Sequence, residues 1–138
     1  MAAVQITRYR LLIADDDDAL RETLRDVFAP FLETVTASSG EEAVCVLERQ
    51  PVHLVLLDMH MRELTGLETL RIVKAELSVP CILMTADWTD ELAEEARAAD
   101  AWCLLRKPIA RQMLMGTVAS AVETAYHDGE FRRRLLAS

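Results

Sequence analysis

The sequence predicts a doubly wound (βα)5 domain of the α/β class, in three layers, with a five-stranded parallel sheet between two layers of helices. Short apolar runs of strand length alternate five times with stretches whose apolar residues recur at helical spacing. The run VHLVLL (52–57) is apolar at nearly every position, which is typical of a strand buried on both faces of a parallel sheet. The length of 138 residues suits one domain, because domains most often have roughly 100–150 residues.

The expected elements follow one another in chain order. Strands are expected at 9–14, 33–37, 52–57, 79–84 and 101–105, each followed by a helix. The helices are expected to begin at Asp17 or Asp18, at Ser39, at Thr65 and Gly66, near Thr89 and near Ile109. Aspartate and serine are good N-cap residues, and Glu42, three residues after Ser39, completes a capping-box pattern.

The charge balance and the apolar pattern exclude several classes of protein. Twenty-three acidic and 15 basic residues give a net charge of −8, which repels phosphate backbones, so we expect no direct nucleic-acid binding. No apolar run approaches the ~20 residues of a membrane span, and the N-terminus lacks the apolar core of a signal peptide. We therefore expect a cytoplasmic protein without membrane contact. Cys45, Cys81 and Cys103 form no CxxC pair and are expected to be small buried apolar residues.

The two ends of the chain are expected to lie outside the main domain. We divide the sequence into an N-terminal segment (1–8), the domain (9–126) and a C-terminal tail (127–138). Gly129 is expected to interrupt the last helix. The tail combines Phe131 with three arginines and two leucines, and two interpretations stay open. It is either a frayed end or a helical extension that pairs with another chain or an acidic partner.

Polar side chains follow four of the five predicted strands. Asp15 and Asp16 end the first strand, Asp58 the third, Thr85 the fourth and Lys107 the fifth. In open parallel sheets the functional site lies beyond the carboxyl ends of the strands. We therefore expect three carboxylates, a hydroxyl and an ammonium group to converge at one edge of the sheet, although the acidic run alone also suits a solvated turn and helix cap.

The chemistry of that cluster points to a metal ion. Two carboxylates ~4 Å apart repel each other by about 4 kcal/mol at an effective dielectric constant of ~20. Lys107 supplies one positive charge, which leaves room for a divalent cation, and carboxylate ligands without His or Cys favour Mg²⁺. A carboxylate beside Mg²⁺ and a lysine is suited to attack phosphorus and form an aspartyl phosphate.

These motifs resemble the receiver domain of bacterial two-component response regulators. The resemblance covers about Tyr9 to Tyr126 and rests on LLIADD, HLVLLD, ILMTA and RKP, in that order and each at the end of a predicted strand. Gly66, eight residues after Asp58, also fits the family pattern. The resemblance implies a flavodoxin-like sheet with strand order 2-1-3-4-5.

The resemblance also implies a role for each acidic residue. Asp58 would be the phosphoacceptor, taking the phosphoryl group from a sensor histidine kinase or a phosphotransfer protein. Asp16 and Asp58 would bind Mg²⁺ directly, Asp15 would act through water, and the backbone carbonyl of His60 would be a further ligand.

The phosphoryl group would be bound by three further residues. Lys107 would pair with it, the Ala86 N–H would contact it, and Thr85 would move toward it and report its presence. The family's Lys-Pro bond is usually cis, so we expect a cis bond between Lys107 and Pro108.

Five positions depart from the family pattern or vary within it. The switch position, three residues before the lysine, usually holds Tyr or Phe and here holds Leu104. Asp100 stands where the family usually has Gly, and Arg62 where it often has Pro. His60 and Asp87 occupy variable positions that tune the lifetime of the aspartyl phosphate, and we expect a moderate lifetime here.

The output and the alternatives follow from the same comparison. We expect a signalling protein rather than an enzyme, a downstream protein partner that the sequence does not identify, and a homodimer contact through the last helix. The main alternative is a pseudo-receiver that binds proteins independently of phosphate, which Leu104 keeps open.

A phosphatase of the haloacid-dehalogenase type is disfavoured because His60 stands where its second aspartate is needed. An FMN carrier is disfavoured because four aspartates would repel the phosphate. The sequence does not separate a complete protein from a fragment of a larger regulator.

Overall fold

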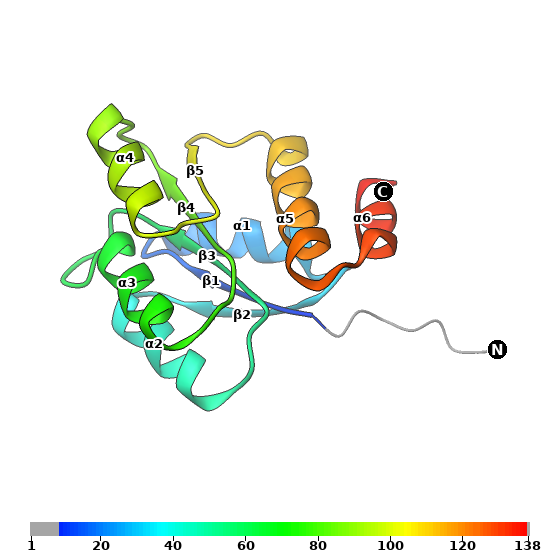
Figure 1. Cartoon of the computed structure of the whole chain (residues 1–138), viewed down its shortest axis with the longest axis horizontal. Helices are drawn as coiled ribbons and strands as arrows, with labels where there is room; N and C mark the ends of the chain where they lie inside the picture. Colours follow the sequence, from blue (N-terminus) through cyan, green and yellow to red (C-terminus); the bar gives the residue numbers. More distant parts are fainter. Residues whose placement is uncertain (1–8, 138) are drawn as a thin grey trace.

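Within residues 9–137, which the computed structural model describes, five strands form one parallel sheet in the order β2-β1-β3-β4-β5 (Figure 1). The strands are β1 (Arg10–Ala14), β2 (Glu33–Ala37), β3 (Leu54–Asp58), β4 (Cys81–Thr85) and β5 (Cys103–Arg106). The helices are α1 (Asp18–Phe28), α2 (Gly40–Arg49), α3 (Gly66–Glu76), α4 (Asp90–Ala98), α5 (Arg111–Tyr126) and α6 (Gly129–Leu136). The predicted fold class and strand order are confirmed. The proposed N-terminal segment, residues 1–8, lies outside the described residues.

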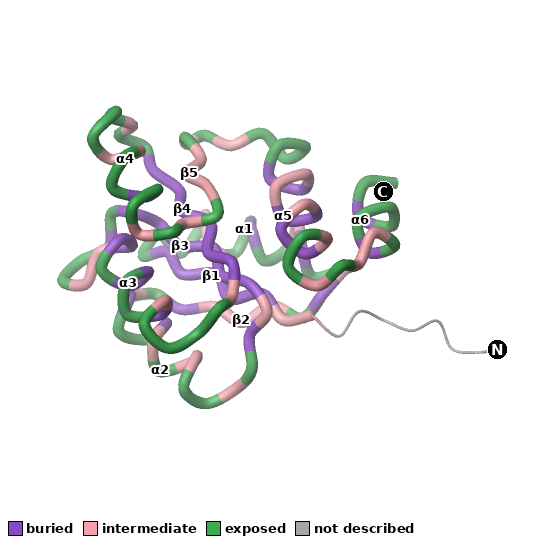
Figure 2. The backbone as a smooth tube through the Cα atoms, viewed as in Figure 1, coloured by how far each residue is buried: buried purple, intermediate pink, exposed green. Residues whose placement is uncertain are grey.

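Side chains that alternate along the strands pack into an apolar cluster on each face of the sheet. Leu11 and Ile13 of β1 lie in the cluster covered by α1, α5 and α6, whereas Leu12 lies in the cluster covered by α2, α3 and α4. All five residues of β3 are buried, as the near-continuous apolar run predicted. Figure 2 shows the buried tube concentrated in the sheet at the centre. The helical layers therefore shield the sheet and leave its carboxyl end for polar side chains.

Side-chain caps begin most of the helices at the predicted positions. Asp17 caps α1 by accepting a hydrogen bond from the Leu20 N–H, and Thr89 caps α4 in the same way. Ser39 caps α2, but the Glu42 carboxylate accepts its hydrogen bonds from Ser38 rather than from the Ser39 N–H. The predicted capping box is thus half formed, because the carboxylate reaches one residue further back.

The C-terminal tail forms a helix that packs on the domain. His127, with φ of 54°, ends α5 in the left-handed region, two residues before the glycine that was expected to interrupt it. Asp128 then caps α6, and Phe131 and Leu135 are 2% and 1% exposed in the cluster beneath α1 and α5. The tail is helical, as the second interpretation expected, and the apolar side of the helix packs on its own chain. Pairing of this helix with another chain or an acidic partner stays a prediction.

The cysteines differ from one another in burial. Cys81 is buried in β4 and Cys103 is partly buried, and burial raises the pKa of these thiols to about 12 and about 11. Cys45 is exposed on α2, so the expectation that all three are buried is wrong for this residue.

In the described part of the chain, no helix is both long and apolar enough to cross a bilayer.

Candidate metal and phosphoryl site

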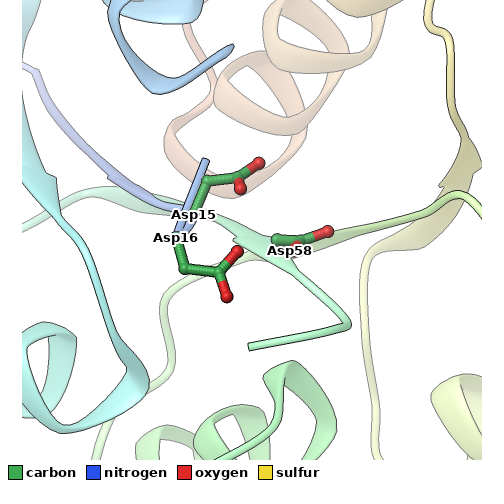
Figure 3. A group of neighbouring side chains, drawn as sticks. All are labelled: Asp15, Asp16 and Asp58. Carbon is green, nitrogen blue, oxygen red and sulfur yellow. The ribbon is translucent and has the colours of Figure 1, made fainter. Parts of the chain in front are cut away.

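Three carboxylates meet at the carboxyl end of the sheet. Asp15 and Asp16 follow β1, and Asp58 is the last residue of the neighbouring β3. One oxygen from each lies within 4.8 Å of the others, and Figure 3 shows the three side chains gathered around one space. Asp15 and Asp58 are 0% and 4% exposed, whereas Asp16 lies open to solvent. The predicted convergence of these three residues is therefore present.

Lys107 joins the two buried carboxylates. Its Nζ lies 3.0 Å from Asp15 Oδ2 and 2.8 Å from Asp58 Oδ1. The lysine follows β5 and is held by a hydrogen bond from its own N–H to Thr85 O at 2.7 Å. The next peptide bond, to Pro108, is cis, as expected. The edge strand β5 thus places Lys107 beside Asp15 and Asp58, which lie far earlier in the chain.

Local backbone contacts fix the positions of the two buried aspartates. Asp15 Oδ1 accepts the N–H of Asp17 at 2.9 Å, so the turn into α1 orients the carboxylate. Arg21 of α1 donates to Asp15 O at 2.7 Å and binds this turn from the other side. Behind Asp58, a Cβ added to Gly66 would lie 2.3 Å from Asp58 O. The start of α3 therefore approaches β3 so closely that only glycine fits there.

Burial and the repulsion between like charges disfavour the three ionised carboxylates, and Lys107 balances only one of their charges. Burial raises the pKa of Asp58 above its ordinary value, the ion pair with Lys107 opposes the shift, and the charge of Asp15 reinforces it. Burial would lower the pKa of Lys107, but its bonds to Asp58 and Asp15 outweigh that and raise it. With all groups ionised, three carboxylates and one ammonium leave a formal charge of −2.

The donor set suits a hard divalent cation. Among residues 9–137, Asp15, Asp16 and Asp58 are the group of carboxylate, histidine and cysteine side chains placed closely enough to share a metal ion. Oxygen ligands without nitrogen or sulfur favour Mg²⁺, Ca²⁺ or Mn²⁺ over zinc or copper. A charge of +2 would balance the residual −2, and the exposed Asp16 leaves the site open to solvent on one side.

Thr85, at the end of β4, is held by two groups that the sequence reasoning did not connect to it. The Asp87 N–H donates to Thr85 Oγ1 at 3.0 Å, and His60 Nε2 lies 3.0 Å from the same oxygen. The Asp87 carboxylate lies 3.8 Å from His60 Nε2. The two variable positions therefore contact the threonine. A signal was present, since residues that follow the ends of adjacent strands β3 and β4 must lie side by side.

The remaining predicted residues lie around this site rather than in it. Leu104 is partly buried in β5 and packs with the cluster beneath α3 and α4. Ala86 is exposed in the loop after Thr85. In the same loop Trp88 lies beneath the guanidinium of Arg106, 5.3 Å from the ring centroid, a contact that the sequence did not predict. Aromatic surface thus lies next to the site although the switch position itself holds leucine.

Asp100, which stands where the family usually has glycine, adopts a backbone conformation that favours glycine. Asp100 has φ of 67°, the left-handed region in which glycine is favoured. Aspartate tolerates this region better than most residues, and the Asp100 carboxylate lies 3.8 Å from Lys74 Nζ. The substitution of glycine by aspartate therefore leaves the turn before β5 intact.

Comparison with known proteins identifies a related family. The model of the family described as "Response regulator receiver domain" matches residues 11–119. The hydrogenase transcriptional regulatory protein HoxA of Cupriavidus necator is 33% identical over 129 residues, 89% of this chain and 26% of that protein. The transcriptional regulatory protein GlrR of Escherichia coli is 32% identical over 115 residues, 82% of this chain and 26% of that protein. The chain thus spans about a quarter of the length of these relatives.

Solved structures with the same fold are also similar. A CheY-like receiver domain protein from Methanospirillum hungatei superposes with a TM-score of 0.83 at 22% identity, covering 89% of this chain and 100% of that one. A response regulator receiver domain from Francisella gives a TM-score of 0.80 at 23% identity, covering 86% of this chain and 99% of that one. At these identities the likeness shows the fold alone, which agrees with the family match.

Proposed function

Because the chain belongs to the response regulator receiver domain family, we propose that it is a phosphorylatable switch, which accepts a phosphoryl group on Asp58 and changes the surface it presents to partner proteins. The observation that carries the proposal is the ion pair of Lys107 with Asp15 and Asp58, beside the open carboxylate of Asp16. This arrangement combines a nucleophile, a cation site and a fixed positive charge in one place.

Asp58 is the nucleophile in this proposal. One of its carboxylate oxygens attacks the phosphorus of a phosphohistidine, a P–O bond forms and the P–N bond breaks, and the released imidazole takes up a proton. The 4% exposure of Asp58 keeps bulk water from most of the side chain. The backbone beneath it is held rigidly, since Gly66 N–H bonds to Met59 O at 3.0 Å.

Charge stabilisation at the site is divided between a cation and the lysine. Asp16 and Asp58 would bind Mg²⁺ directly, with Asp15 acting through water and the His60 backbone carbonyl as a further ligand. Mg²⁺ supplies positive charge that offsets the charge of the transferring group. Lys107 already touches Asp58 Oδ1, so its ammonium is placed to pair with a phosphoryl oxygen once one is bonded there.

Thr85 and Ala86 then report the phosphoryl group. The Thr85 hydroxyl and the Ala86 N–H would donate hydrogen bonds to its oxygens, and the loop that carries them would move. This loop also carries Trp88, which stacks on Arg106 at the end of β5. A movement at the site therefore changes the surface of β5 and α5, where Met113 is 58% exposed.

The partners follow from the chemistry of the reaction. A sensor histidine kinase or a phosphotransfer protein would donate the phosphoryl group, and a downstream protein would bind the surface formed by β5 and α5. A cavity of about 340 Å³ there is lined mainly by apolar side chains, among them Leu104, Ile109 and Met113. The same face, or the last helices, would carry a homodimer contact.

The first test is the intact mass after incubation with acetyl phosphate and Mg²⁺. We expect the mass of one added phosphoryl group, and none in Asp58→Asn or without Mg²⁺. An adduct that persists in Asp58→Asn would place the phosphoryl group elsewhere. If no adduct forms although Mg²⁺ binds, the chain is a pseudo-receiver whose protein binding does not depend on phosphate.

A further inference from the structure

His60 lies against the hydroxyl group that the proposed switch depends on. Its Nε2 is 3.0 Å from Thr85 Oγ1, within ordinary hydrogen-bond distance. Thr85 is fully buried, whereas the His60 side chain that contacts its hydroxyl is 52% exposed. The histidine therefore covers Thr85 from the solvent side.

The second contact of the hydroxyl leaves its own proton available to His60. The Asp87 N–H, which is always a donor, gives its proton to Thr85 Oγ1 at 3.0 Å. A hydroxyl has one proton of its own to donate, and a neutral imidazole has one nitrogen that accepts. In the tautomer with the ring proton on Nδ1, Nε2 of His60 accepts the hydrogen bond that the Thr85 hydroxyl donates.

We propose that His60 is a positioning residue that holds the Thr85 hydroxyl away from the phosphoryl site. In this state the Thr85 proton is committed to Nε2. A phosphoryl group on Asp58 requires the same proton for its own hydrogen bond, so the contact to His60 must break first. The inference rests on the proposed function, and it assigns to the His60 side chain a bias toward the unphosphorylated state.

The energetics keep this bias within the range of a reversible switch. An exposed imidazole that loses the hydroxyl recovers a hydrogen bond from water, so the net cost is that of one ordinary hydrogen bond. Removal of such a bond corresponds to about a fivefold change in an equilibrium constant. Removing the accepting nitrogen of His60 should therefore strengthen binding of a phosphoryl analogue about fivefold, through Thr85 alone.

Two substitutions separate the hydrogen bond from the bulk of the ring. His60→Phe keeps a planar ring over Thr85 but has no acceptor, and His60→Gln keeps an amide group that can reach the position of Nε2. The affinity of each for beryllium trifluoride in the presence of Mg²⁺ is measured by titration of backbone amide signals. Each is also made in a Thr85→Val background, where no hydroxyl is present, as a double-mutant cycle.

The expected result is about fivefold tighter binding for His60→Phe, wild-type binding for His60→Gln, and no effect of either in Thr85→Val. Equal affinities of wild type and His60→Phe, or the same gain in Thr85→Val, would overturn the positioning role and leave the proposed function intact. Absence of beryllium trifluoride binding by every variant, wild type included, would overturn both.

A spectroscopic measurement checks the geometry independently. Imidazole nitrogen signals recorded at alkaline pH, where the rings are neutral, should show Nε2 of His60 unprotonated in the free protein. That signal should shift when beryllium trifluoride and Mg²⁺ are added, while His53 and His127 serve as internal references. A protonated Nε2 in the free protein would contradict the proposal.

Discussion

The two ends of the sheet are stabilised by different kinds of contact. At the carboxyl end, the buried Asp15 and Asp58 pair with the partly buried Lys107, which leaves more negative than positive charge. At the amino end, the rings of Tyr9, His53, Tyr126 and Phe131 pack with centroids 5.2–5.6 Å apart. Polar groups at this end are paired, since the Tyr126 hydroxyl donates to His53 O at 2.5 Å.

Two aspartates show what this difference means. At the carboxyl end, burial raises the pKa of Asp58, so its charged form is disfavoured in the folded protein. At the amino end, the Tyr9 hydroxyl and the Phe131 N–H donate to Asp128 and lower its pKa. The charged groups at the carboxyl end therefore destabilise the folded protein but form a site that a cation and a phosphoryl group can complete. The contacts at the amino end stabilise the folded protein.

The largest expected effect comes from removing the aromatic cluster's contact with α6. Phe131 is 2% exposed and packs edge-to-face on Tyr9 at 5.2 Å. Phe131→Ala should lower the free energy of unfolding by about 3–5 kcal/mol, as measured by denaturant titration, and Phe131→Leu should lower it by less. At a temperature where both proteins are folded, the reaction with acetyl phosphate should be unchanged.

A smaller loss of stability in Phe131→Ala would mean that α6 contributes little to the stability of the whole sheet. If Phe131→Ala costs under about 1 kcal/mol, α6 opens separately from the domain, and only local unfolding is affected. Hydrogen exchange of the α6 amides would then be fast while β1 and β3 stay protected. That result would contradict the conclusion that the amino end stabilises the whole sheet.

The two aspartates should respond to substitution with opposite sign. Asp58→Asn removes a buried charge whose folded-state pKa is raised, and at neutral pH it should stabilise the protein by roughly 0.5–2 kcal/mol. Asp128→Ala removes the cap of α6 and the bond to Tyr9, and should destabilise it by about 1 kcal/mol. Thermal unfolding without Mg²⁺ measures both. A loss of stability in Asp58→Asn would show that the pair with Lys107 is a net stabilising contact.

Much of the carboxyl end could be predicted from the sequence, because its residues directly follow strands. Five apolar runs indicate the sheet, and the residue after each run must lie at its carboxyl edge, which places Asp15, Asp58 and Lys107 together. The contact of His60 with Thr85 was missed because it depends on the alignment of β3 with β4 beyond the last paired residues.

The amino end was harder to predict for a physical reason. Phe131 and Leu135 are four residues apart, which suits one side of a helix, but eight residues are too few for a stable helix without a packing partner. That partner is a surface built from β1 and α1, which are far away in the sequence, together with the preceding α5. Nothing local separates such a helix from a frayed end, so the tail stayed undecided until its packing was known.

The smallest expected effect is a pH dependence that distinguishes the two ends. Burial lowers the pKa of His53 below the ordinary 6.5, the nearby charge of Arg10 adds to this, and Glu33 opposes it. The folded protein therefore binds a proton at His53 less readily than the unfolded chain does. The contribution of His53 to stability should be complete above about pH 6.5 and should decrease as the pH falls through and below that value.

The carboxyl end should respond to acid in the opposite direction, which determines the design of the measurement. Because the pKa of Asp58 is raised, its protonation as the pH falls favours the folded state and would mask the effect of His53. Denaturant titrations between pH 8 and 5 are therefore best compared in Asp58→Asn with and without His53→Gln. The loss of stability toward acid should be smaller with His53→Gln than without it. An unchanged slope in His53→Gln would mean that acid acts on the amino end through a group other than the ring that accepts the Arg10 N–H.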